Sequence, residues 1–245
     1  MQKLKVIYQE SPAQLSCLKF PYVPVITDYH TSQIPMIYDH GFVAFGKCFK
    51  MARSVRVDLT SFECNSENRR LIRKAQDMRP RIELCKKDHD RLILQDDFIN
   101  SCIEFSKQRY VDNGRLTRHG YWEIYHNPII TDVVSLSLDG TRRGTVFLCN
   151  HGNMMHYWHA FYDLNFNQIE RLALGKYLML QTILYAKKMG KTHLYLGAAY
   201  DHSDYYKIND WQSLYWWDGE KWSADTACLK NLCRGHYQTY VKKEE

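Results

Sequence analysis

The chain has 245 residues, 45% of them hydrophobic, and it carries 18 Tyr, 10 Phe and 6 Trp. This composition excludes a disordered chain, and no apolar run approaches the ~18 residues that a membrane helix needs. A formal net charge of +6 permits a polyanionic partner such as RNA without requiring one. Because the N-terminus lacks a signal-type apolar core and the eight cysteines form no close C-x-x-C pair, we expect a cytoplasmic protein with reduced thiols and no membrane partner.

Residues 1–80 are expected to form a small N-terminal α+β portion. Alternation, prolines and glycines predict a strand at 3–8, an extended passage at 21–35, a short helix at 32–40 ended by Gly41, and strands at 42–51 and 55–59. A helix at 65–78 follows, capped by Asn65 or Ser66 with Glu67 in its first turn.

Residues 81–245 are expected to form the larger domain. The predicted elements are a strand at 81–85, a helix at 96–110, a helix capped by Thr117 that ends near Pro128, strands at 133–138, 144–149 and 155–162, a long helix at 169–189, a strand at 192–196, and a hairpin joining 214–217 to 221–222. Asp139-Gly140 is a strong hairpin-turn signal inside the strand meander. The pattern predicts a mixed α/β fold, with the long helix packed across a sheet of about six strands.

The helix at 65–78 is strongly amphipathic. At 100° per residue its basic side chains share one arc and its apolar side chains the other; the basic ones are Arg69, Arg70, Arg73 and Lys74. Such a stripe can follow a phosphate backbone, because each basic contact releases counterions. The alternative is an ordinary solvated helix face.

Leu174-Gly175-Lys176-Tyr177-Leu178 opens the long apolar helix, and a short buried strand later ends at Gly197. This order is similar to that of N-acyltransferases of the acetyl-CoA type (the GNAT-type fold), in which it builds the acyl-donor cleft. Amides at the helix start attract electron-rich groups, and Lys176 adds charge. Because the preceding loop lacks the second small residue of a pyrophosphate loop, coenzyme A is disfavoured as the donor. The alternative for Gly175 is a helix-starting glycine without a ligand.

Two further segments carry candidate site residues. In the strand before the long helix, alternation places Tyr157, His159, Phe161 and Asp163 on one face. Asp163, at the strand end, can accept a proton or orient an attacking amine, so Asp163 and Tyr157 are the catalytic candidates; the alternative for Asp163 is a turn aspartate. Beyond the buried strand, Lys207 can anchor a terminal nucleotide or a substrate carboxylate, and Tyr206 can stack on a base. The alternative is a surface lysine beside core tyrosines.

No metal site is expected. His156 and His159 are three apart on a predicted strand and so point to opposite faces, and no carboxylate is spaced to help. Cys228 and Cys233 diverge by about 140° on a helix. No cysteine has an activating neighbour in sequence, which argues against a cysteine nucleophile.

The order of several short motifs resembles the aminoacyl-tRNA–protein transferases, the arginyl and leucyl enzymes, over roughly residues 17 to 222. The matching pieces are Gly41-Phe42, Ser54-Val55-Arg56-Val57, Phe62, Ser66-Glu67-Asn68-Arg69-Arg70, the strand from Tyr157 to Asp163, Leu174-Gly175-Lys176-Tyr177, Tyr195-Leu196-Gly197 and Tyr206-Lys207. The resemblance implies an acetyltransferase-like fold that moves an aminoacyl group from tRNA to the α-amine of an acidic N-terminal residue.

Two departures from the family matter. Only Cys17 and Cys48 remain of its cysteine cluster, too few for a structural zinc or iron–sulfur site. Ala198-Ala199 replace its aromatic pair after Leu-Gly, which reshapes the acceptor pocket and disfavours an acidic acceptor. The expected function is aminoacyl transfer from aminoacyl-tRNA, as co-substrate and without another cofactor, to a peptide or protein amine. The alternatives are an acyl-coenzyme A N-acyltransferase and a non-catalytic RNA-binding module.

Overall fold

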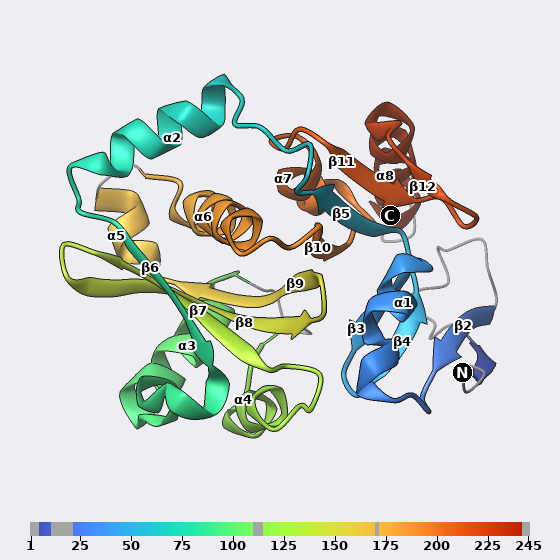
Figure 1. Cartoon of the computed structure of the whole chain (residues 1–245), viewed down its shortest axis with the longest axis horizontal. Coiled ribbons are helices and arrows are strands. Elements are labelled where there is room, and N and C mark those ends of the chain that lie inside the picture. Colours follow the sequence, from blue (N-terminus) through green and yellow to red (C-terminus); the bar gives the residue numbers. More distant parts are fainter. Residues whose placement is uncertain (1–4, 11–21, 110–114, 170–171, 242–245) are drawn as a thin grey trace. The chain divides into compact units, whose positions relative to one another are not determined.

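A computed structural model describes residues 5–10, 22–109, 115–169 and 172–241 (Figure 1). Helices and strands alternate along these segments, so the expected mixed α/β class is confirmed. Among these helices, none combines the length and the apolar character that a membrane span requires. Cys17 and the first residues of the strand expected at 3–8 lie outside the described residues.

The chain forms two compact units. Unit 1 takes its described residues from 1–65, 151–154 and 191–245, and unit 2 from 66–150 and 155–190. This grouping does not follow the boundary expected at residue 80. The physical reason is strand pairing, since β5 (Ser54–Asp58) pairs antiparallel with β10 (His193–Ala198) and β11 (Leu214–Trp217), which brings both ends of the chain into one unit.

Unit 1 contains two runs of antiparallel strands, in the orders β1-β2-β4-β3 and β12-β11-β5-β10. Its remaining elements are β1 (Val6–Glu10), β2 (Tyr22–Ile26), α1 (Ile34–Asp39), β3 (Phe42–Phe45), β4 (Cys48–Met51), α7 (Tyr205–Ile208), β12 (Trp222–Ser223) and α8 (Thr226–Val241). The strand expected at 42–51 is wrong as a single element. It is a hairpin, in which Phe45 pairs with Cys48 around Gly46, whose φ of 58° suits a tight turn.

Three elements of unit 1 were not expected from sequence: β2, the short helix α7 and the C-terminal helix α8. Residues 22–26 contain Pro24 and were expected only to be extended, yet the segment pairs with β1 along its whole length. α8 begins where the side chain of Asp225 accepts a hydrogen bond from the Cys228 amide at 2.9 Å, a helix-capping contact.

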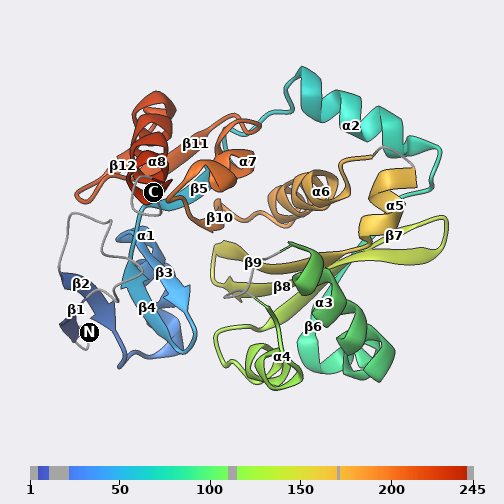
Figure 2. The ribbon, with the colours of Figure 1, turned by 180° about the vertical axis from the view of Figure 1, so that it is seen from behind.

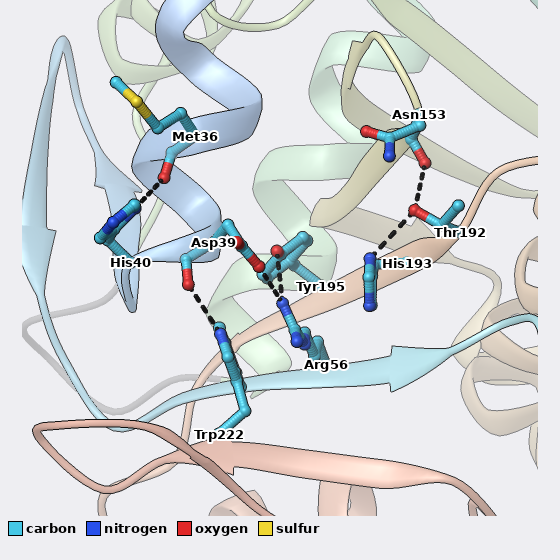
Figure 3. Close-up of polar contacts among 9 residues, drawn as sticks. All are labelled: Met36, Asp39, His40, Arg56, Asn153, Thr192, His193, Tyr195 and Trp222. Atoms are coloured by element: carbon cyan, nitrogen blue, oxygen red, sulfur yellow. Dashed lines mark hydrogen bonds and ion pairs between the residues drawn. The ribbon is translucent and has the colours of Figure 1, made fainter.

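Arg56 joins four elements of unit 1 (Figure 3). Its Nη1 donates to Asp39 Oδ1 at 2.7 Å and to the Tyr195 hydroxyl at 3.2 Å, and its guanidinium lies 3.9 Å from the centre of the Trp222 ring. Trp222 in turn donates its indole N–H to the carbonyl oxygen of Asp39 at 2.7 Å. With only 11% of its side chain exposed, Arg56 fixes the end of α1 against β5, β10 and β12.

Unit 2 is built around the strand order β9-β8-β7-β6. Its elements are α2 (Ser66–Gln76), β6 (Arg81–Lys86), α3 (Asp96–Arg109), α4 (Arg118–Tyr125), β7 (Asp132–Leu138), β8 (Thr141–His151), β9 (Met154–Tyr162), α5 (Leu164–Ile169) and α6 (Leu174–Lys188). The expected Asp139-Gly140 turn is confirmed, with φ angles of 49° and 77°. The expected Thr117 cap is confirmed as well, since its Oγ1 accepts from the Gly120 amide at 3.0 Å.

Helices cover both faces of these strands, α6 on one side and α3 with α4 on the other (Figure 1, Figure 2). On the α3 side, Ile99, Cys102 and Tyr121 pack against Val133 and Phe147. On the α6 side, a Cβ added to Gly144 would lie 2.9 Å from Leu178, so the helix rests almost directly on the backbone of β8. Apolar side chains buried on both faces of these strands therefore hold the helices of unit 2 in place.

The single helix expected at 169–189 is wrong. One helix, α5, ends at Ile169, and another, α6, begins at Leu174. The Asp163 side chain explains why α5 begins directly after β9. Its Oδ1 accepts a hydrogen bond from the Phe166 amide at 3.0 Å and so caps the helix. The apolar periodicity of the segment conceals this interruption.

Gly41 illustrates how the Gly41-Phe42 motif is constrained by packing. Its φ is +80°, and a Cβ added there would lie 2.3 Å from ring atoms of Trp217. Two effects therefore disfavour any other residue at position 41. Its backbone is in the left-handed region, and a Cβ would clash with the Trp217 ring. Gly46 has a φ of +58° but no atom within 4 Å of an added Cβ, so it tests the backbone effect alone.

We expect Gly41→Ala to destabilise the protein more than Gly46→Ala does. The left-handed backbone costs ~1–2 kcal/mol in both variants, and the clash with Trp217 adds ~1–3 kcal/mol in the first one only. Urea denaturation of both variants and the wild type measures the difference. Equal losses of unfolding free energy would contradict the packing role of Gly41.

Candidate functional site

The helix α2 is amphipathic as expected. Leu71 and Ala75 are buried, while Arg69, Arg70 and Arg73 are exposed and Lys74 is half-buried. Asn68 was not expected inside, yet it is fully buried on the apolar side. The four basic side chains thus lie along the outer part of the helix. Together with Lys176 of α6, they are called the basic face below.

Glu67 connects the two helices of the basic face. Its carboxylate accepts two hydrogen bonds from Arg70 at 2.7 Å, and its Oε1 lies 3.5 Å from Nζ of Lys176. The bond from Arg70, and to a smaller extent the charge of Lys176, lowers the pKa of Glu67 to about 2. Glu67 therefore stays ionised at neutral pH and holds the start of α6 beside the basic residues of α2.

The residue at the N-cap position of α6 has no side chain that could cap the helix. Ala173 occupies the N-cap position and makes no side-chain hydrogen bond, and the first helical bond runs from the Tyr177 amide to the Ala173 carbonyl at 2.8 Å. The amides of the first turn carry the positive end of the helix dipole. A Cβ added to Gly175 would lie 2.6 to 2.7 Å from the ring of Tyr162, so packing alone already requires glycine there.

A cavity of about 400 Å³ lies in unit 2 beside the end of β9. Its apolar wall consists mainly of Phe98 and Phe105 from α3 and of Phe161 and Tyr162 from β9. The ring centre of Phe105 lies 5.8 Å from that of Phe161 and 4.8 Å from that of Tyr162. Tyr162 belongs both to this wall and to the contact with Gly175, so one side chain links the cavity wall to the start of α6.

Asp163 lines the cavity and is held from two sides. Its Oδ2 lies 2.7 Å from Nη1 of Arg143, and its Oδ1 caps α5 through the Phe166 amide. The Asp163 amide also donates to the Arg143 carbonyl at 2.9 Å. Each carboxylate oxygen has one further lone pair, so Asp163 can still accept a hydrogen bond from an amine while these contacts persist.

Two polar atoms at the cavity find no hydrogen-bond partner among the described residues, Oγ1 of Thr145 and Nε of Arg143. Thr145 is 1% exposed, and it lies two residues after Arg143 on β8. A buried polar group without a partner is costly, so both atoms suit a ligand that accepts hydrogen bonds. Neither residue was a candidate from sequence. The pair Arg142-Arg143 just after the Asp139-Gly140 turn could have drawn attention to β8. Which polar atoms lack a hydrogen-bond partner depends on tertiary packing and cannot be predicted from such a pattern.

Three of the other expected site residues lie in unit 1. Gly197 has a φ of 85° at a bulge where β10 pairs with β5, which explains the glycine by backbone geometry. Tyr206 is 47% exposed. Nζ of Lys207 donates to the Ala198 carbonyl at 2.8 Å and to Asp204 at 2.7 Å, with 15% of its side chain exposed. Lys207 therefore ties α7 to the end of β10, and its contacts support a local structural role.

Tyr157 is 8% exposed on β9 and is not among the described residues that line the cavity. His159, two residues further on, is half-buried, and desolvation lowers the pKa of His159 to about 4. Within the described part of the chain, no three His, Cys, Asp or Glu side chains are grouped so that they could hold a metal ion.

No protein-family model matches the chain, and no curated protein matches it in sequence. Solved structures to which it is similar include the C-terminal domain of a putative lysylphosphatidylglycerol synthetase from Agrobacterium fabrum (15% identity, TM-score 0.44), FemX (11%, 0.45) and a GCN5-related N-acetyltransferase from Kribbella flavida (12%, 0.33). The alignments cover 68%, 74% and 74% of this chain, but only 51%, 65% and 59% of those chains. With TM-scores below 0.5, none of these similarities assigns an activity to this chain.

The lowered pKa of the half-buried His159 predicts a fold that is less stable in acid. An unfolded histidine binds its proton near pH 6.5, but folded His159 does so only near pH 4. Stability from this residue is therefore complete above pH 6.5 and is lost as the pH falls towards 4, by about 2 kcal/mol at pH 5. Urea denaturation at pH 7 and pH 5 should show a smaller loss for His159→Gln than for the wild type. His119→Gln, at an exposed position on α4, should behave like the wild type.

Proposed function

We propose that the chain transfers an aminoacyl group from aminoacyl-tRNA to an amine of a peptide or protein. The observation that carries this proposal is the junction at Glu67, which holds the basic face of α2 beside the start of α6. Aminoacyl-tRNA is a polyanion whose reactive ester lies at one end. A site for it needs cations along the phosphates and a positive electrostatic potential at the ester, and unit 2 supplies both.

The proposed chemistry is direct aminolysis. The acceptor nitrogen attacks the ester carbonyl carbon, a C–N bond forms, and the C–O bond to the terminal ribose breaks. The amine loses a proton, and the ribose hydroxyl leaves with one. The Gly175 amide and the positive end of α6 stabilise the negative charge that develops on the carbonyl oxygen. No covalent intermediate on the protein is needed, so the rate depends mainly on positioning.

Asp163 is proposed to orient the attacking amine. It lines the cavity next to Tyr162, whose ring contacts the helix start at Gly175. Because Arg143 and the α5 amide hold its carboxylate, Asp163 accepts a hydrogen bond from the amine in a fixed direction. Tyr157, Tyr206, Lys207 and Gly197 remain predicted site residues with no specific role in this step.

Two alternatives are kept. An acyl-coenzyme A N-acyltransferase would use the same helix start, but α6 offers Gly175 alone where a pyrophosphate loop has two small residues. An RNA-binding module without chemistry would use the basic face and leave the cavity without a role. Acetyl-coenzyme A binding favours the first alternative, and tRNA binding without any product favours the second.

The basic face should bind tRNA. Replacing Arg69, Arg70 and Arg73 by Glu is expected to weaken tRNA binding by about tenfold or more, and to reduce the slope of log affinity against log salt by about 3, since about one counterion is released per contact. The control replaces Lys47, Lys188 and Lys221, all exposed and outside the basic face, and changes the net charge equally. Equal losses of tRNA affinity in both variants would show that overall charge, and not the position of the basic face, determines binding.

Transfer should depend on the start of α6. With labelled aminoacyl-tRNA and a panel of peptides, Lys176→Ala is expected to lower the transfer rate at limiting tRNA by about tenfold, because one charge-assisted contact is lost. Lys188→Ala, at the other end of the same helix, should have no effect. Acetyl-coenzyme A serves as a parallel donor. Product from acetyl-coenzyme A and none from any charged tRNA would reverse the choice of donor.

A further inference from the structure

We propose that the cavity of unit 2 binds the N-terminal residue of the acceptor peptide, and that this residue carries a large apolar side chain. The inference rests on the proposed function, because it names the acceptor class for that site. The cavity combines three kinds of surface, an aromatic wall, unpaired hydrogen-bond donors and carboxylates. Each kind fits one of the groups of an N-terminal residue: its side chain, its carbonyl and its amine.

The aromatic wall accounts for the side chain. Phe98, Phe105 and Phe161 line the cavity, and Leu92 and Leu164 extend the apolar surface. Phe105 is 7% exposed and meets Phe161 edge to face, at an interplanar angle of 76°. Such a surface gains free energy by covering apolar area, and a volume of about 400 Å³ falls in the range of small-molecule sites.

The unpaired donors account for the carbonyl. Oγ1 of Thr145 and Nε of Arg143 lie two residues apart on β8, and both are buried without a partner among the described residues. The Arg143 Nε–H can only donate, and the threonine hydroxyl can donate as well. One carbonyl oxygen with two lone pairs can satisfy both atoms, which removes a cost that the empty cavity carries.

The carboxylates account for the amine. Asp163 and Glu104 line the same cavity, Asp163 from the end of β9 and Glu104 from α3. The two arginines at the cavity already have carboxylate partners, since Arg142 pairs with Asp90 at 2.8 Å and Arg143 with Asp163 at 2.7 Å. Asp163 is paired with Arg143 and Glu104 with Lys107 at 3.2 Å, and each carboxylate keeps lone pairs that can accept a hydrogen bond from a ligand amine. An acidic side chain, as the family resemblance implies, would instead be buried against aromatic rings, beside two arginines whose charges Asp90 and Asp163 already balance.

Calorimetric titration with three dipeptide amides tests this without tRNA. Phe-Ala-amide should bind at least about tenfold more tightly than Asp-Ala-amide or N-acetyl-Phe-Ala-amide. The Asp peptide loses the apolar contact with the aromatic wall, and the acetylated peptide loses the charged amine. Thr145→Val keeps the shape of the side chain and removes the hydroxyl. It should weaken Phe-Ala-amide binding by about tenfold, while the melting temperature of the free protein stays equal or rises because an unpaired buried hydroxyl is gone.

Ser101→Ala is the matched control. Ser101 also lines the cavity, but its hydroxyl already donates to the Phe98 carbonyl at 2.7 Å, so binding should change less than about twofold. Equal binding of the Phe and Asp peptides, or unchanged binding by Thr145→Val, would overturn the inference. Selective binding of Phe-Ala-amide without transfer from any charged tRNA would overturn the proposed function alone. Transfer to Asp-initiated but not to Phe-initiated peptides would overturn this inference alone.

Discussion

The ion pair between Arg143 and Asp163 is the contact on which the candidate site of unit 2 depends. It joins the beginning of β8 to the end of β9, and a backbone bond between the same two residues, at 2.9 Å, fixes their alignment. The same aspartate starts α5 through the Phe166 amide. Tyr162, one residue earlier, is thereby held against Gly175 and Phe105. One partly buried carboxylate thus sets the cavity wall and the approach to α6, and loss of either partner would leave the other charge without compensation.

Glu67 has a comparable position on the outer surface. A run of basic side chains on α2 repels the lysine that begins α6, and a single carboxylate between them converts this repulsion into a contact. The pKa of Glu67, lowered to about 2, means that the carboxylate remains charged over the whole physiological range. The basic face is therefore one pre-arranged surface, whose net charge stays positive because its five cations outnumber the single carboxylate of Glu67.

Local signals predicted local structure well. The Asp139-Gly140 turn, the Thr117 cap and the buried arc of α2 each follow from a few adjacent residues, and the structure confirms them. Features that depend on distant residues were missed. The β3–β4 hairpin turns at Gly46 without the Asn-Gly or Asp-Gly pair that marks such turns, and the grouping into two units follows from β5 pairing with C-terminal strands. The sequence around Thr145 does not predict that its hydroxyl is buried without a hydrogen-bond partner among the described residues, because this depends on tertiary packing.

Most positions that gave the family resemblance have a packing or backbone reason for their identity. Gly41 faces the Trp217 ring, Gly175 faces Tyr162, Gly197 sits at a bulge, and Lys207 bonds a carbonyl and a carboxylate of its own loop. Because the fold requires these residues, they would stay at the same places along the chain whether or not the protein transfers an acyl group. Groups that the fold leaves unsatisfied are more informative about function. Thr145 is the clearest of these, since its buried hydroxyl has no hydrogen-bond partner among the described residues and a ligand could supply one.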